Sequence, residues 1–188
     1  MLKFTTTTLL LTAACLVAFA VQSAEPTQSS LESGAKQRIG QFGSELKATL
    51  QQAISSGGPT KGIEVCRDEA PKIAAKYSTD GWKIGRTSHK TRNPDNQPNK
   101  WESQQIEQFQ QAIAEGQPAA TLETSELTEN SFRFAKAIMT DDICLGCHGA
   151  HLADNVAEAL RQNYPEDMAT GFNSGDLRGI FTVEKQLP

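Results

Sequence analysis

Apolar residues recur at helical spacing in the first third of the chain. Between residues 39 and 54 they stand three or four positions apart, as on one face of an amphipathic helix; they are Ile39, Phe42, Leu46, Leu50 and Ile54. The Ser-Ser-Gly-Gly-Pro segment at 55–59 ends this helix. A second helical stretch is predicted over 61–77, with Cys66 facing inward.

Alternating apolar and polar residues predict strands later in the chain. Three segments show this pattern, at residues 82–86, 132–138 and 177–185. A polar loop with two prolines at 92–98 leads to a helix that Asn99 and Glu102 cap and Gly116 closes, and another helix is expected at 155–163. Because no strand–helix–strand rhythm is present, we predict an α+β fold with an antiparallel sheet, a long N-terminal helix and flanking helices.

The first residues have the pattern of an export signal. Lys3 provides a positive start, residues 9–21 form an apolar run, and small residues follow at Ser23 and Ala24. The run is shorter than the roughly 20 residues that span a bilayer. We therefore expect a signal peptide at 1–24, a flexible lead-in at 25–34, where polar residues accompany Pro, Ser and Gly, and a single periplasmic domain at 35–188.

The charge balance narrows the range of partners. Asp and Glu number 22 against 18 Lys and Arg, and the net charge of −4 becomes about −5 once Lys3 is removed. A mildly acidic chain without a basic stripe is not typical of nucleic-acid-binding proteins. No segment after the leader is apolar enough to span a membrane. We expect no stable membrane span after signal removal, and a docking partner that is basic.

One motif carries specific chemistry. Cys144-Leu145-Gly146-Cys147-His148 is the C-x-x-C-H pattern of c-type haem attachment. On a helical turn, two thiols three residues apart share a face and add to the two vinyl groups, while the histidine reaches the iron. We expect one covalently bound haem c near the C-terminal third, with His148 as an iron ligand.

The mature chain has a third cysteine, Cys66, whose thiol is not used in haem attachment. The residues leave three roles open, namely an inert buried cysteine, an intermolecular disulfide, and a thiolate ligand on the distal side of the iron. Competing distal ligands are His89, His151 and the reserve candidate Met168. A redox dithiol is the alternative to haem, as is a zinc site that Cys66 and His151 would complete with the C-x-x-C pair.

Arg92 is the candidate for contact with a haem propionate. Its guanidinium fork suits a carboxylate, and Asn93-Pro94 would fix its direction. The alternative is an ordinary exposed arginine, which is the preferred interpretation for Arg86. Acid/base pairs, a serine triad and a phosphate loop are not evident, so we expect an electron carrier or sensor and not an enzyme.

A series of short motifs runs in order along the chain. It comprises Cys66-Arg67, Ala70-Pro71, Gly85-Arg86-Thr87-Ser88, Arg92-Asn93-Pro94 with Asn96, Pro98 and Trp101-Glu102, the haem motif with Gly149, Tyr164-Pro165 with Asp167, Ala169 and Gly171, and Gly175-Asp176-Leu177-Arg178-Gly179. The series resembles the haem-binding PAS-like family of bacterial c-type haem proteins, a former domain of unknown function, over about residues 35–185.

The resemblance implies a PAS-like α+β domain whose iron is ligated by the motif histidine, here His148, and by an upstream cysteine, here Cys66. Family members occur as free periplasmic proteins and as sensor portions of membrane-bound receptors, and we expect a free-standing member. A thiolate opposite histidine stabilises ferric iron, so the expected function is low-potential electron transfer or redox sensing with a redox partner protein. The alternative is a CO or NO sensor that works through a partner protein; a haem enzyme ranks third.

Overall fold

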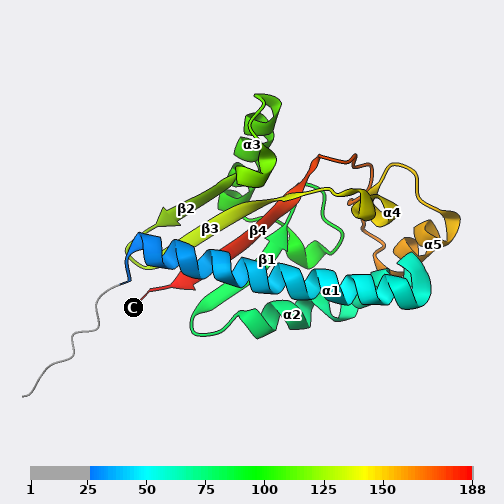
Figure 1. Cartoon of the computed structure of the whole chain (residues 1–188), viewed down its shortest axis with the longest axis horizontal. Coiled ribbons are helices and arrows are strands. Elements are labelled where there is room, and N and C mark those ends of the chain that lie inside the picture. Colours follow the sequence, from blue (N-terminus) through cyan, green and yellow to red (C-terminus); the bar gives the residue numbers. More distant parts are fainter. Residues whose placement is uncertain (1–25, 188) are drawn as a thin grey trace, which may run out of the picture.

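A four-stranded antiparallel sheet with helices on both faces forms the centre of the computed structural model, which describes residues 26–187 (Figure 1). The strands are β1 (Trp82–Thr87), β2 (Glu123–Leu127), β3 (Ser131–Met139) and β4 (Leu177–Gln186), in the order β1-β4-β3-β2. The helices are α1 (Gln28–Asp68), α2 (Ala70–Tyr77), α3 (Lys100–Ala114), α4 (Leu145–His148) and α5 (Asp154–Asn163). This architecture confirms the predicted α+β class. The predicted signal peptide at 1–24 lies outside the described residues.

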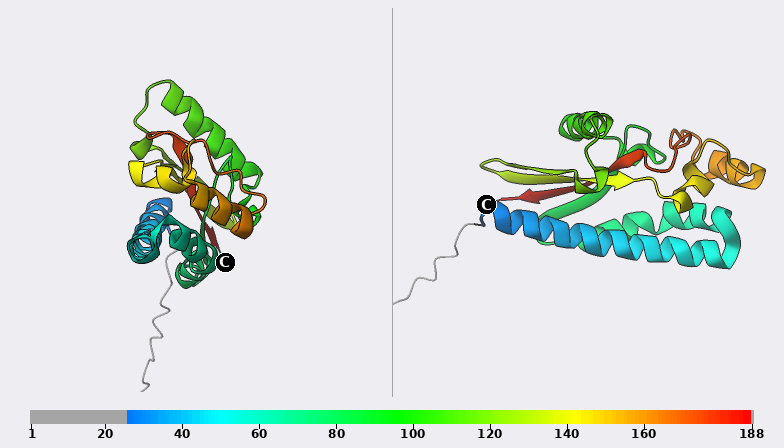
Figure 2. Two further views of the ribbon diagram at one scale, coloured as in Figure 1. Left: turned by 90° about the vertical axis from the view of Figure 1, so that its right-hand side faces the viewer. Right: turned by 45° about the horizontal axis from the view of Figure 1, so that its top comes forward.

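Different helices cover the two faces of the sheet (Figure 2). On one face, α1 and α2 pack against the sheet through a core that includes Phe42, Ile73, Ile84, Phe132, Phe134 and Val183. On the other face, α3 packs through Ile106, Phe109, Ala135, Leu177 and Ile180. Because successive side chains of a strand point to opposite faces, β3 contributes alternate residues to the two cores.

α1 starts earlier than the sequence pattern indicates. Thr27 caps the helix by accepting a hydrogen bond from the Ser30 amide at 3.2 Å, and Leu31 is only 3% exposed. The expected flexible lead-in at 25–34 is therefore wrong, because residues 28–34 form the first turns of the helix. Leu31 and Ala35 extend the apolar spacing backwards from Ile39, and their burial outweighs the weak helix preference of the Ser and Gly residues around them.

The predicted end of the first helix is a kink. Gly57 and Gly58 leave the helical conformation, and the chain then resumes a helical path to Asp68. In this second segment of α1, Ile63 packs against Val156 and Leu160 of α5. α1 therefore reaches past the sheet to the α4–α5 end of the molecule (Figure 1).

β2 is the strand that the sequence pattern does not predict. Its residues, Glu-Thr-Ser-Glu-Leu, are half-buried or exposed, and the strand pairs only with β3 at the edge of the sheet. An edge strand with charged and polar residues does not show the alternation that marks a half-buried strand. This explains why its pattern was not recognised.

The other predicted elements agree with the structure. The three predicted strands correspond to β1, β3 and β4, and the predicted helix at 155–163 corresponds to α5. Asn99 and Glu102 form the expected capping box, in which each side chain accepts a hydrogen bond from the other residue's amide, at 3.0 and 2.8 Å. Between residues 26 and 187, no helix combines the length and the apolar character that crossing a membrane requires.

Candidate functional site

The C-x-x-C-H motif lies on a short helical turn just beyond the end of β3. Cys144 ends a 3-10 turn and His148 ends α4, and the thiols of Cys144 and Cys147 are both free and half-buried. Gly149 then turns the chain away, and a Cβ at this position would lie 2.6 Å from the carbonyl oxygen of Leu145. Only glycine allows so close an approach of the backbone to the preceding turn.

Thr140, which directly precedes this turn, does not cap it. Asp141 occupies the N-cap position, whereas Thr140 is 2% exposed and its hydroxyl has no hydrogen-bond partner in the described part of the chain. The Thr140 amide instead donates to the carbonyl of Asp176, and its own carbonyl accepts from the Gly175 amide, both at 2.9 Å. Backbone pairing with the segment before β4 therefore anchors the start of the motif.

His148 is oriented by a backbone carbonyl. Its Nδ1 lies 2.7 Å from the carbonyl oxygen of Ala169, and because a carbonyl can only accept, Nδ1 carries the proton. Burial, with a further contribution from Arg178, lowers the pKa of His148 from 6.5 to about 2, which keeps the imidazole neutral. The free lone pair is then on Nε2, as in metal-ligating histidines whose other nitrogen is held by a backbone acceptor.

A buried ion pair holds that carbonyl in place. Arg92 Nη2 lies 3.1 Å from Asp167 Oδ2, and the two side chains are 11% and 9% exposed. Asp167 Oδ1 accepts from the Ala169 amide at 2.8 Å, and Arg92 Nη2 donates to the carbonyls of Cys147 and Ala169 at 2.5 and 3.2 Å. The pair thus ties the Ala169 segment to the motif and positions His148.

This network changes the role expected for Arg92. Its Nε donates to Asp167 at 3.2 Å, so the Nε and Nη2 donors of the fork are both bonded within the chain. Arg92 is therefore a positioning residue for the motif, and the propionate contact expected from the sequence stays a prediction.

Cys66 lies near the motif on the second segment of α1. Ile63, one turn earlier, belongs to the same packed cluster as Cys147 and Tyr164. Burial raises the pKa of Cys147. The positive charge of Arg92 opposes this rise, and the charges of Cys66 and Cys144 add to it. Burial raises the pKa of Tyr164 to about 12, again with Cys66 contributing. The fold therefore places Cys66, itself half-buried, one helical turn from a residue that packs with Cys147.

The competing ligands are placed differently. Met168, the reserve candidate, is 58% exposed, and His151 is exposed. No group of three or more His, Cys, Asp or Glu side chains in residues 26–187 is arranged to hold a metal ion. The zinc site that Cys66 and His151 would complete with the C-x-x-C pair is therefore not formed.

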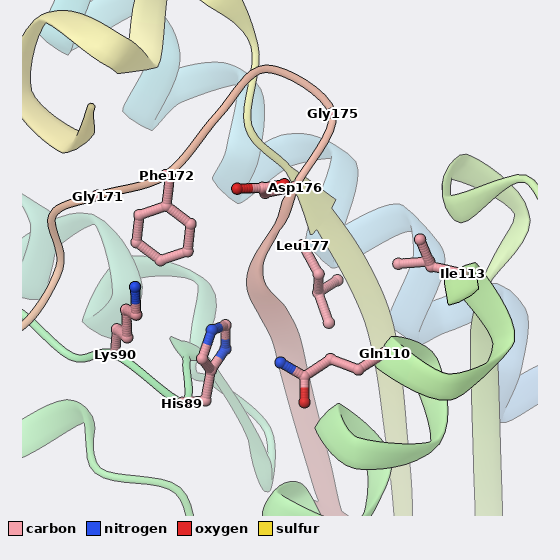
Figure 3. A pocket seen from close by; sticks show the side chains of 9 residues that line it. All are labelled: His89, Lys90, Gln110, Ile113, Gly171, Phe172, Gly175, Asp176 and Leu177. Carbon is pink, nitrogen blue, oxygen red and sulfur yellow. The ribbon is translucent and has the colours of Figure 1, made fainter. Parts of the chain in front are cut away.

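Phe172 connects the motif to a neighbouring cavity. Its ring stands edge-on to His148, with ring centroids 6.4 Å apart, and edge-on to His89 at 5.8 Å. The cavity, of about 300 Å³, is bordered by His89, Lys90, Gln110 and Phe172 among others (Figure 3). The motif cysteines and His148 do not line it. His89 thus belongs to this cavity, and burial lowers its pKa, as do Lys90 and Arg178.

The site includes residues that sequence reasoning missed. Asp167 and the carbonyl of Ala169 orient His148, and Arg178 lies with its guanidinium carbon 4.9 Å from the Phe172 ring centroid. All three residues occur in the ordered motifs of the sequence. Only their position in those motifs could have drawn attention to them, because a single Asp or Arg without periodic neighbours carries no pattern of its own.

Comparisons with known proteins give a family and a solved structure whose similarity to this chain extends over the candidate site. A sequence model of the Tll0287-like family matches residues 13–185. Among solved structures, the crystal structure of the cyanobacterial haem-protein Tll0287 is similar, with a TM-score of 0.55 and 27% identity over 85% of this chain and 91% of that chain. No curated protein matches the sequence.

Proposed function

This chain belongs to the Tll0287-like family, and from that premise we propose that it is an exported protein that carries one covalent haem c. Cys144 and Cys147 would hold the haem as thioethers, His148 would ligate the iron, and Cys66 would supply the second ligand. A haem held in this way supplies a one-electron couple at its iron. We propose that the protein uses this couple in low-potential electron transfer or redox sensing in the periplasm.

The observation that carries the proposal is the state of His148. Its Nδ1 is committed to the Ala169 carbonyl at 2.7 Å, which leaves Nε2 unprotonated on the same helical turn as two free thiols. This donor set fits a c-type haem, because two thiols add to vinyl groups and a neutral imidazole ligates the iron. The solved relative, described as a haem-protein, supports the coarser part of this proposal, that the protein binds haem.

The proposal of low potential rests on Cys66. An anionic thiolate stabilises ferric over ferrous iron, and so lowers the reduction potential relative to His/Met ligation. The packing of its neighbour Ile63 with Cys147 supports a place for Cys66 beside the attachment turn. A role as carrier or sensor, and not as an enzyme, is supported by Asp167, since this buried carboxylate is engaged with Arg92 and the Ala169 amide and is not free for proton transfer.

Absorption and low-temperature EPR spectra of the ferric protein test the ligand assignment. We expect a low-spin thiolate signal that Cys66→Ala abolishes while the haem stays attached. Val65→Ala, one residue away on the same helix and also half-buried, is the matched control and should keep the signal. A spectrum that Cys66→Ala leaves unchanged would contradict the assignment.

The same samples, reduced, separate electron transfer from the sensing of gases. If the Cys66 bond survives reduction, CO should bind slowly or not at all. Rapid CO binding to the wild-type protein, at a rate that Cys66→Ala does not increase, would instead favour the gas-sensor function.

A further inference from the structure

β4 begins with an irregularity that redirects one side chain. Ile138 pairs with Gly179 and Met139 with Leu177, so Arg178 has no partner on β3. Such β-bulges re-aim side chains next to functional sites. Gly179 has a φ of +155°, and a Cβ there would lie 2.2 Å from the carbonyl oxygen of Thr87, so this path of the chain requires glycine. The bulge turns Arg178 away from the core that Leu177 shares with α3.

The redirected guanidinium lies beside the attachment turn. Its central carbon is 4.9 Å from the centroid of the Phe172 ring, which in turn contacts His148. Arg178 Nη1 donates to the Lys90 carbonyl at 3.3 Å, and the side chain makes no other hydrogen bond to the described residues. Two of its three donor nitrogens are therefore available to a ligand.

The charge of Arg178 is not neutralised by the described chain. None of the ion pairs within residues 26–187 includes Arg178 or Arg86, whereas Arg92 is paired with Asp167. Arg86 is half-buried near the end of β1, opposite Phe181, which stands three positions after Arg178 on β4. Burial, and next the neighbouring charge of Arg86, lower the pKa of Arg178 to about 10. Arg178 is half-buried, and a guanidinium that is partly withdrawn from water without a counter-charge is unfavourable, so such groups are usually paired with an anion.

We propose that Arg178 and Arg86 form the binding site for the two propionate carboxylates of the haem. The inference rests on the proposed haem attachment and adds to it a second point of fixation. The thiols would use the two vinyl groups of the haem, and Arg178 and Arg86 would each neutralise one of its two negatively charged propionates. A guanidinium fork binds a carboxylate through two parallel hydrogen bonds. Arg92 has a counter-charge in Asp167, whereas no ion pair of the described residues includes Arg178 or Arg86.

The test is a redox titration of the haem-loaded protein as a function of pH. Arg178→Gln and Arg86→Gln each remove one positive charge, so the reduction potential should fall because ferric iron becomes relatively more favourable. The redox-linked pKa assigned to a propionate should rise by at least about one unit, a tenfold change in proton affinity, because an opposite charge at close range lowers a carboxyl pKa by about 1–3 units.

Arg133→Gln is the matched control for charge. Arg133 lies on β3, where its partly exposed side chain pairs with Glu126 at 3.7 Å. Met139, at the motif end of β3, is six positions further along the strand, about 20 Å at the rise of a strand, and screening removes most of the charge interaction at that range. Arg178→Lys keeps the charge without the fork. Its reduction potential should stay close to that of the wild type, and its pH dependence should lie between those of the wild type and Arg178→Gln. If Arg178→Gln does not fold, the Lys variant still tests the proposal.

Three results would refute the proposal that Arg178 and Arg86 bind the propionates, and each can be distinguished from the others. If Arg178→Gln and Arg86→Gln titrate like Arg133→Gln while the haem remains attached, the inference fails and the proposed function stands. If added phosphate or acetate shifts the wild-type profile as much as Arg178→Gln does, the arginines bind free anions and not propionates. If intact wild-type protein carries no haem, the proposed function itself fails.

Discussion

Replacing Asp167 by Asn should destabilise the fold more than any change at a surface ion pair. The side chains of Arg92 and Asp167 are 11% and 9% exposed, so the substitution leaves a buried guanidinium without its counter-charge. Removing one partner of a buried pair costs about 3–5 kcal/mol. Arg92 keeps its bonds to the carbonyls of Cys147 and Ala169, so we expect the lower end, about 3 kcal/mol. For a domain of this size, that loss lowers Tm by roughly 6–12 °C.

Urea and thermal unfolding followed by circular dichroism measure this loss. Glu158→Gln is the matched control, because Glu158 pairs with Arg161 on α5 and the two side chains are 52% and 68% exposed. An exposed pair contributes at most about 1 kcal/mol. If Asp167→Asn were no more destabilising than Glu158→Gln, the Arg92–Asp167 pair would not be the device that holds the Ala169 carbonyl against His148.

Three further substitutions test local features of the fold. Thr140→Val should leave the free energy of unfolding unchanged or raise it by about 1 kcal/mol in urea titrations, because it removes a buried hydroxyl without a partner; a clear loss would show that the hydroxyl is bonded. Gly179→Ala should cost at least about 2 kcal/mol, given the 2.2 Å approach to the Thr87 carbonyl, and a variant as stable as wild type would refute the need for glycine in the bulge. Glu45 accepts a hydrogen bond from Tyr77 at 2.6 Å, and hydrogen bonds, from Lys76 first, lower its pKa below 4.5. The stabilisation is therefore present above pH 4.5 and lost as pH falls further, so the Tm difference between wild type and Glu45→Gln should shrink in acid; a difference constant with pH would contradict this.

Regular elements could be predicted because their burial is periodic. The apolar face of α1 and the alternation in β1, β3 and β4 follow directly from packing against the two sides of one sheet. The start of α1 was misplaced because Ser and Gly around Leu31 resemble a linker, and only the presence of the sheet shows that Leu31 is buried. β2 was missed because an edge strand has no need of alternating apolar residues.

The candidate site likewise contains residues that the sequence indicates and residues that only the folded structure brings to it. Cys144, Cys147 and His148 could be singled out from the sequence because the C-x-x-C-H pattern places them at fixed spacing within one turn. The residues that orient or surround them come from distant segments, and Arg92 and Asp167 stand 75 positions apart in the sequence. Such contacts exist only after folding, so the sequence drew attention to Arg92 but could not indicate its partner Asp167. Arg178 was overlooked because its direction depends on a bulge, which is set by pairing between strands.

The most direct test of the account is the intact mass of the exported protein, made in a bacterium that matures c-type haem proteins, with denaturing haem staining alongside. We predict that the wild-type chain carries the added mass of one haem that survives denaturation, and that Cys144→Ser combined with Cys147→Ser abolishes it while Cys66→Ala retains it. A wild-type chain that shows only its polypeptide mass and two free thiols at the motif would contradict the central claim.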